Sequence, residues 1–173
     1  YPPNIDGFCR LVADGGFFFL PPAKGLAVCG GASHGIFVSR EYQRFLHGNS
    51  NRVQFLPDLD DAALWTLKSA AHAFLLPIAF GGGTNLKSAE AIASGRWVVT
   101  TSTAMRGRED YADAPGIVVA DTPKAFRRAM IDVMGSAPLK LTPAQRKARD
   151  QAYWDRVLAN SGVQAALQTL AAR

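Results

Sequence analysis

The chain has 173 residues, of which 48% are hydrophobic and 19% are charged, and its formal net charge is +5 at pH 7. This length and hydrophobic content predict one domain with a sizeable core, and no apolar run approaches the roughly 20 residues of a membrane-spanning helix, so we expect a soluble protein or fragment. The positive charge favours acidic partners, and the basic residues lack the interleaved aromatic side chains of a platform for single-stranded nucleic acid.

Short apolar segments alternate with longer segments of helical length along most of the chain. The short segments are apolar almost throughout, as expected for strands covered on both faces. In chain order we expect a helix over residues 5–19, a strand over 26–29, a helix over 39–47, a strand over 53–56, a helix over 60–71, a strand over 73–77, a helix over 84–94, strands over 97–100 and 117–120, and a helix over 123–134. This alternation predicts an α/β fold in which a Rossmann-like parallel sheet carries helices on both faces.

Polar residues at three predicted helix starts have the chemistry of N-caps. Asp60 can cap the third helix, and Thr122 followed by a proline can cap the helix over 123–134. Thr142 and Gln145 have the spacing of a capping box, which predicts a further helix to about residue 158.

The last part of the sequence reads as a helical tail. Residues 160–162 break the helix that Thr142 begins, and a last short helix is expected to reach residue 170. We therefore divide the chain into a Rossmann-like domain over residues 1–135 and a helical tail over residues 136–173 that packs on the same domain. Arg146, Lys147 and Arg149 are expected to form a solvated face of this tail.

A glycine-rich loop follows the predicted strand over 73–77, in the stretch "LLPIAFGGGTNLKSAEAIASGRWVV". Open parallel sheets bind ligands at the carboxyl ends of their strands, and consecutive glycines let a backbone approach a ligand closely. The helix expected to start at Thr84 would add free N–H groups and the positive end of its dipole. The combination suits an anion, and phosphate above all.

Two charged residues follow this loop on the predicted helix. Lys87 can reach an anion at the start of the helix as a flexible point charge, and Glu90 lies deeper, where it could accept hydrogen bonds from sugar hydroxyls. The alternative is a tight connection with a solvated Lys87 and a surface Glu90. The loop matches neither GxxxxGK[ST] nor GxGxxG, so no kinase or dehydrogenase follows from it.

Several segments in order resemble the carboxy-terminal domain of GT-B-type glycosyltransferases of the glycosyl transferases group 1 family. They are "YPPNIDGF", "LAVCGG", "RVQFLPDLDDAALWTLKSAAHAFLLPIAFGGGTNLKSAEAIASGRWVVTTSTAMRG" and "GIVVADTPKAFRRAMIDVM". The resemblance implies that residues 1–135 form a nucleotide-sugar-binding domain. It also implies a second, amino-terminal domain that holds the acceptor, and a first strand upstream of Tyr1. We therefore expect the chain to be part of a two-domain enzyme.

The resemblance carries family roles to matching positions. Glu90 matches the second glutamate of the family pattern and would bind the ribose hydroxyls of the donor. Leu56, Pro57 and Asp58 match the nucleobase position, and the first glutamate of the pattern, which touches the transferred sugar, falls at Gly82. The residues matching the loop and helix start that meet the diphosphate are Gly83, Thr84, Asn85 and Leu86.

The function that this resemblance implies is sugar transfer from a nucleotide-diphosphate sugar to a hydroxyl acceptor with retained anomeric configuration. Lys87 is the candidate catalytic residue, because it could stabilise the charge left on the diphosphate. We expect the isolated domain to be inactive. The alternatives are a sugar-nucleotide epimerase, a phosphorylase of GT-B architecture, or a non-catalytic nucleotide-binding module.

The remaining expectations concern partners and location. The donor is a substrate, and we expect no resident cofactor, no metal and no nucleic-acid partner. A cytoplasmic location is expected, and the basic helices allow peripheral contact with the inner face of the membrane. The sequence does not identify the base or the sugar of the donor, the acceptor, or the oligomeric state.

Seven further residues have less specific interpretations. His34 is expected in a glycine-rich turn, and Arg106 is read equally as a diphosphate contact or an ordinary loop arginine. Cys9 and Cys29 are expected to be reduced packing residues. Trp65, like Trp97 and Trp154, is expected to pack in the core or between domains.

Overall fold

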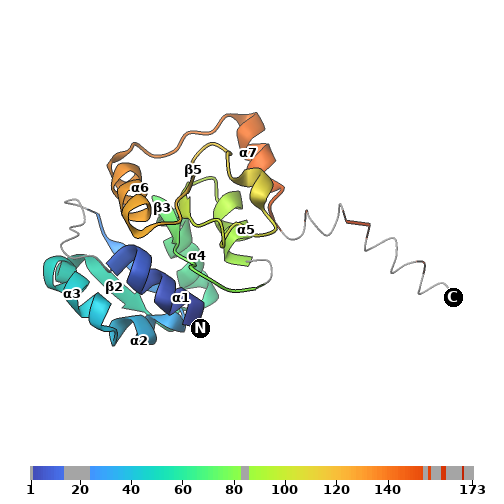
Figure 1. Cartoon of the computed structure of the whole chain (residues 1–173). Coiled ribbons are helices and arrows are strands. Elements are labelled where there is room, and N and C mark those ends of the chain that lie inside the picture. Colours follow the sequence, from blue (N-terminus) through green and yellow to red (C-terminus); the bar gives the residue numbers. More distant parts are fainter. Residues whose placement is uncertain are drawn as a thin grey trace.

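The computed structural model describes residues 2–13, 24–82 and 86–153, together with residues 156, 161, 162 and 169. Strands and helices alternate within these ranges, and the helices lie around two short parallel sheets (Figure 1). In chain order the elements are α1 (Pro2–Gly7), the π-helical η1 (Phe8–Ala13), β1 (Leu26–Cys29), α2 (Ala32–Phe37), α3 (Arg40–Asn49), the 3₁₀ turn η2 (Ser50–Arg52), β2 (Val53–Leu56), α4 (Asp61–Ala70), β3 (Ala73–Leu76), α5 (Leu86–Ala93), β4 (Trp97–Thr100), the 3₁₀ turn η3 (Glu109–Tyr111), β5 (Ile117–Val119), α6 (Pro123–Gly135) and α7 (Pro143–Asp150).

The strands pair in parallel, as the sequence predicts. β1 pairs with β2, and β3, β4 and β5 form a second sheet in that order. The strands form two separate sheets, because β1 and β3 share no ladder among the described residues. The expected first strand upstream of Tyr1 stays a prediction.

Side chains of β4 alternate between two hydrophobic clusters, so the second sheet is covered on both faces. Trp97 and Val99 pack in the cluster that contains residues of η1, α3 and α6. Val98 packs in a different cluster, with Ala91 of α5. Helices on both faces of a parallel sheet confirm the predicted α/β, Rossmann-like fold class.

All three predicted N-caps are confirmed. The Asp60 carboxylate accepts from the Ala63 N–H at 2.7 Å, and the Thr122 hydroxyl accepts from the Ala125 N–H at 3.2 Å. Thr142 and Gln145 form the reciprocal capping box at the start of α7.

Two helix predictions need correction. Residues 32–37, expected as a turn, form α2, because the buried Ser33 hydroxyl turns back onto the carbonyl oxygen of Val28 at 3.1 Å and anchors the new helix to β1. The helix expected to reach residue 158 ends at Asp150. The chain then turns, and Ala152 is buried against Ile92.

The chain's first helix also differs from its expected form. It starts at Pro2 and widens into a π-helix at Phe8, and the expected continuation over residues 14–19 lies outside the described residues. The predicted helix to residue 170 also lies largely outside them. Among the helices that the structure describes, none has the length and apolar character to cross a bilayer.

Candidate functional site

The loop after β3 runs from the carboxyl end of the strand toward α5. Its first part is fixed, because the Thr101 hydroxyl donates to the Ile78 carbonyl oxygen at 2.6 Å. Helix α1 crosses this part at very short range, and a Cβ added to Gly7 would lie 1.6 Å from the Pro77 carbonyl oxygen. Gly82 is exposed, and a Cβ added there would meet no atom within 4 Å. The backbone at Gly82 is therefore accessible to a ligand.

Three predicted diphosphate contacts, Gly83, Thr84 and Asn85, lie outside the described residues. Leu86, the fourth, begins α5 and is 57% exposed.

Helix α5 presents both of its predicted functional side chains to solvent. Lys87 and Glu90 are exposed, whereas Ser88 and Ala89 between them are buried. Glu90 is held by Lys68 of α4, whose Nζ lies 2.6 Å from the Glu90 Oε2. Lys87 has no ion-pair partner within the part of the chain that the structure describes.

The predicted nucleobase segment lies at the carboxyl end of β2 and leads into α4. Leu56 is half-buried, and its carbonyl oxygen accepts from the Gly30 N–H at 3.0 Å. Pro57 and Asp58 are exposed. Because Lys68 is carried by α4, its ion pair with Glu90 joins the nucleobase segment's helix to α5. The sequence analysis did not anticipate this connection.

Arg106 contacts the glycine loop. It lies in the turn that follows β4, and its guanidinium donates to the Gly81 carbonyl oxygen. The turn after β4 therefore contacts the glycine loop. This hydrogen bond does not distinguish between the two expected roles of Arg106, a diphosphate contact and an ordinary loop arginine.

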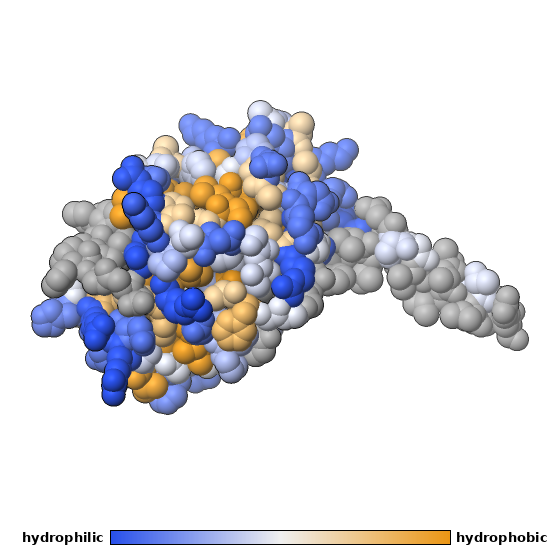
Figure 2. Space-filling view, in the orientation of Figure 1, coloured by the Kyte–Doolittle hydropathy of each residue, from blue (hydrophilic) through white to orange (hydrophobic). Residues whose placement is uncertain are grey.

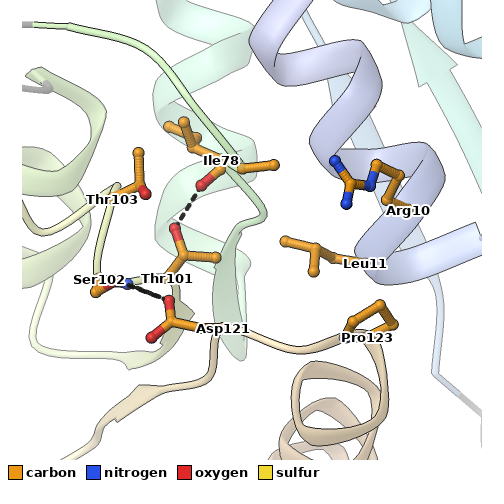
Figure 3. A pocket seen from close by; sticks show the side chains of 9 residues that line it. Arg10, Leu11, Ile78, Thr101, Ser102, Thr103, Asp121 and Pro123 are labelled. Carbon is orange, nitrogen blue, oxygen red and sulfur yellow. Dashed lines mark hydrogen bonds between the residues drawn. The ribbon is translucent and has the colours of Figure 1, made fainter.

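A cavity of about 360 Å³ opens beside this loop, at the carboxyl ends of β3, β4 and β5. Residues of η1 form one side, and the residues that follow the three strands form the other (Figure 3). Asp121, just after β5, accepts at Oδ1 from both the N–H and the hydroxyl of Ser102, at 2.8 and 2.9 Å. The sequence analysis did not select Asp121, Ser102 or Arg10; the available signal was that Ser102 and Asp121 each follow a predicted strand.

The far end of α5 is fixed by a buried cation from α7. Arg149 is 1% exposed, which corrects the expectation that it belongs to a solvated face. Its guanidinium donates to the carbonyl oxygens of Ile92 at 2.7 Å, Arg96 at 2.8 Å and Pro115 at 2.9 Å. Burial lowers the pKa of Arg149 to about 10, so it remains a cation at neutral pH. A cation at the C-terminal end of a helix also interacts favourably with its dipole.

The less specific expectations have mixed outcomes. His34, expected in a turn, is exposed on helix α2. Cys9 and Cys29 form no disulfide in the described part of the chain, and no three metal-binding side chains group together among the described residues. Trp65 is 68% exposed, so it is not a core residue of this chain, and Trp97 is half-buried. Trp154 lies outside the described residues.

Comparison with known proteins supports the resemblance drawn from the glycine loop and its flanking strands. The model of the family described as glycosyl transferases group 1 matches residues 23–136, a range that contains all five strands and every residue selected from the sequence for the donor. No curated protein matches the chain. The family match covers well over half of the 173 residues, and the chain therefore belongs to the glycosyl transferases group 1 family.

Proposed function

We propose that this chain is the donor-binding domain of a retaining glycosyltransferase, which moves a sugar from a nucleotide-diphosphate sugar to a hydroxyl acceptor. The single observation that carries the proposal is the ion pair between Lys68 and Glu90. It joins the helix that follows Leu56, Pro57 and Asp58 to the helix that follows the glycine loop. The paired residues lie 22 positions apart in the sequence. A nucleotide that spans the nucleobase segment and the glycine loop would require α4 and α5 to be held side by side in this way.

The nucleoside end of the donor would lie between α4 and α5. Lys68 occupies Oε2 of Glu90, and the other carboxylate oxygen can accept from a ribose hydroxyl. The exposed Pro57 ring and the Asp58 carboxylate are available to the base.

The diphosphate would lie at the glycine loop. Free N–H groups at the start of α5 and the positive end of its dipole attract an anion, and Lys87 adds a charge that no carboxylate in the described part of the chain neutralises. The open space above Gly82 admits the phosphates without a side chain in the way.

Catalysis in this proposal is stabilisation of a leaving group. When the bond between the anomeric carbon and the diphosphate oxygen breaks, the electron pair stays on the diphosphate, and Lys87 and the loop N–H groups stabilise that charge. Removal of one such preorganised donor typically slows turnover by about 10²-fold or more. Retention at the anomeric carbon is what the family resemblance implies.

An amino-terminal domain would hold the acceptor on the opposite side of the donor. Apolar side chains on both sides of the glycine loop support such a partner, because Phe80 and Leu86 are 47% and 57% exposed. Hydrophobic residues also reach the surface in the middle of the face shown in Figure 2, between more polar regions. In this proposal the single domain binds the donor and transfers nothing.

A cytoplasmic location with peripheral membrane contact belongs to the same proposal. Helix α3 exposes Arg40 and Arg44, four residues apart on one side, and such basic faces bind anionic lipid surfaces. If the acceptor is a soluble molecule, the enzyme does not need this membrane contact.

Calorimetry against UDP, GDP and ADP tests donor binding. We expect one of them to bind the 173-residue chain and Glu90→Gln to weaken that binding, while Glu41→Gln on α3 leaves it unchanged. Absence of binding by all three would contradict the proposal.

With the amino-terminal domain restored, release of sugar 1-phosphate would instead identify a phosphorylase, and release of an epimerised nucleotide sugar would identify an epimerase. Nucleotide binding without any turnover would identify a non-catalytic module.

A further inference from the structure

We propose that the cavity at the carboxyl ends of β3, β4 and β5 is a subsite for a single sugar ring, with Asp121 and Arg10 as its opposed polar contacts. The proposal rests on the proposed function only for the source of that ring, which is the donor's transferred sugar or a sugar of the acceptor. The subsite itself is argued from its residues.

The Asp121 carboxylate on one wall has a fixed orientation, and one of its two oxygens is available to a ligand. Asp121 uses Oδ1 to accept two hydrogen bonds from Ser102, which fixes the plane of the carboxylate at the edge of the cavity. No described group bonds to Oδ2, and this oxygen can accept from a ligand hydroxyl. A carboxylate held in this way is preorganised, so little side-chain freedom is lost when a ligand binds.

The opposite wall supplies a donor. Arg10 extends from η1 into the cavity, where Leu11 lies beside it (Figure 3). Its ion pair with Asp6 is 3.5 Å long, and its side chain is 65% exposed, so much of the guanidinium stays accessible to a ligand. Arginine only donates and a carboxylate only accepts, whereas each sugar hydroxyl does both. A ring with several hydroxyls can therefore satisfy the two walls at once.

The rest of the lining suits the apolar side of a sugar ring. Leu11, Ile78 and Pro123 present carbon atoms between the two polar walls. The volume of about 360 Å³ lies at the small end of the range of about 300–1,000 Å³ for ligand pockets. That volume fits one ring better than a whole nucleotide.

The cavity also borders the first part of the loop after β3, upstream of Gly82. Ile78 and Ala79 line it, and the turn after β4 that contributes Ser102 and Thr103 also reaches Gly81 through Arg106. With glycine at position 82, no carboxylate is available from the loop itself. Asp121, just after β5, supplies a carboxylate to the cavity.

Amide NMR of the 173-residue chain with α-methyl glycosides of glucose, mannose, galactose and N-acetylglucosamine tests the subsite. We expect at least one of them to shift the Ser102 and Thr103 amides in a saturable way. Asp121→Asn keeps an oxygen for the Ser102 N–H but removes the charge, and should weaken that binding about tenfold or more. Asp113→Asn, an exposed aspartate in the turn before β5, is the matched control and should bind as the wild type does. Circular dichroism checks that both variants are folded.

The proposal is overturned if no glycoside shifts these amides, or if Asp121→Asn binds as tightly as the wild type. A nucleoside diphosphate that shifts α5 while every glycoside fails would overturn the subsite and leave the proposed function standing. Glycoside binding at Ser102 without any nucleotide binding would uphold the subsite and contradict the proposed function. Displacement of the glycoside by a nucleotide sugar, but not by the nucleotide alone, would assign the ring to the donor, and simultaneous binding would assign it to the acceptor.

Discussion

The Lys68 ammonium lies 2.6 Å from the Glu90 carboxylate, across 22 positions of sequence. The two side chains are 33% and 50% exposed, and solvent screens such a pair strongly. Its contribution to folding is therefore small, on the order of 0.2–1 kcal/mol. Its consequence for the proposed function is that one oxygen of Glu90 is held while the other faces solvent.

Lys68→Ala should weaken nucleoside diphosphate binding with little change in stability. Loss of the ammonium frees Glu90 to rotate away from the proposed ribose position, and we expect about two- to fivefold lower affinity. Calorimetry and urea unfolding measure the two effects separately. The control is Arg128→Ala, which breaks a comparable exposed pair with Asp132 on α6. Equal affinities for both variants and the wild type would show that Lys68 does not orient Glu90.

In the proposed two-domain enzyme, Lys87→Ala should lower turnover by about 10²-fold, because Lys87 is the proposed cation on the leaving diphosphate. Its exposure predicts an unchanged melting temperature. Lys124→Ala, another exposed lysine near the start of a helix, should leave turnover unchanged. Steady-state kinetics that do not separate these two variants would remove Lys87 from the mechanism.

Arg149→Met should lower the free energy of unfolding by about 3 kcal/mol or more. The substitution leaves a buried carbonyl oxygen at the end of α5, and the partly buried carbonyl oxygens of Arg96 and Pro115, without their donor. Each hydrogen bond to a charged group contributes about 1.5–3 kcal/mol. Urea unfolding measures the loss. Lys147→Met, an exposed neighbour on α7, should change stability by less than about 0.5 kcal/mol. Similar losses for both would mean that α7 does not fix α5.

Gly7→Ala should destabilise the fold by about 1–3 kcal/mol, the usual cost of overpacking. The added Cβ would meet backbone at Pro77, which cannot move aside as a side chain would. Gly135→Ala, where a Cβ meets nothing within 4 Å, is the control and should not destabilise the chain. If Gly7→Ala unfolds at the wild-type urea concentration, α1 does not approach the loop after β3 as closely as described.

The strands and the helix caps could be predicted from sequence because both depend on neighbouring residues. Apolar runs between breakers identified all five strands, with ends shifted by at most one residue, and Pro77 lies outside β3 because proline cannot donate to a ladder. Helix α2 was missed because Gly30 and Gly31 suggested a turn. Ser33 instead anchors a helix through a bond to β1, which is a tertiary contact that no local pattern reveals.

The remaining features could not be predicted from the sequence, because they depend on which distant segments of the chain contact one another. The burial of Arg149 follows from the carbonyl groups at the end of α5, more than 50 residues earlier, so a basic cluster alone suggested a solvated face. Asp121 and Ser102 meet because β4 and β5 are neighbours in the sheet. Lys87 and Glu90 were selected from the glycine loop and the family pattern, and their roles stay predictions until a nucleotide is seen to bind.

Amide chemical-shift mapping with the tightest-binding nucleoside diphosphate is the most direct test of the central claim, that the surface joining α4, α5 and the glycine loop binds the donor. The account predicts that saturable shifts concentrate at residues 56–58, at residues 80–90 and around Lys68, and that Glu90→Gln weakens them together. Shifts concentrated elsewhere on the chain, or identical binding by the Glu90→Gln variant, would contradict it.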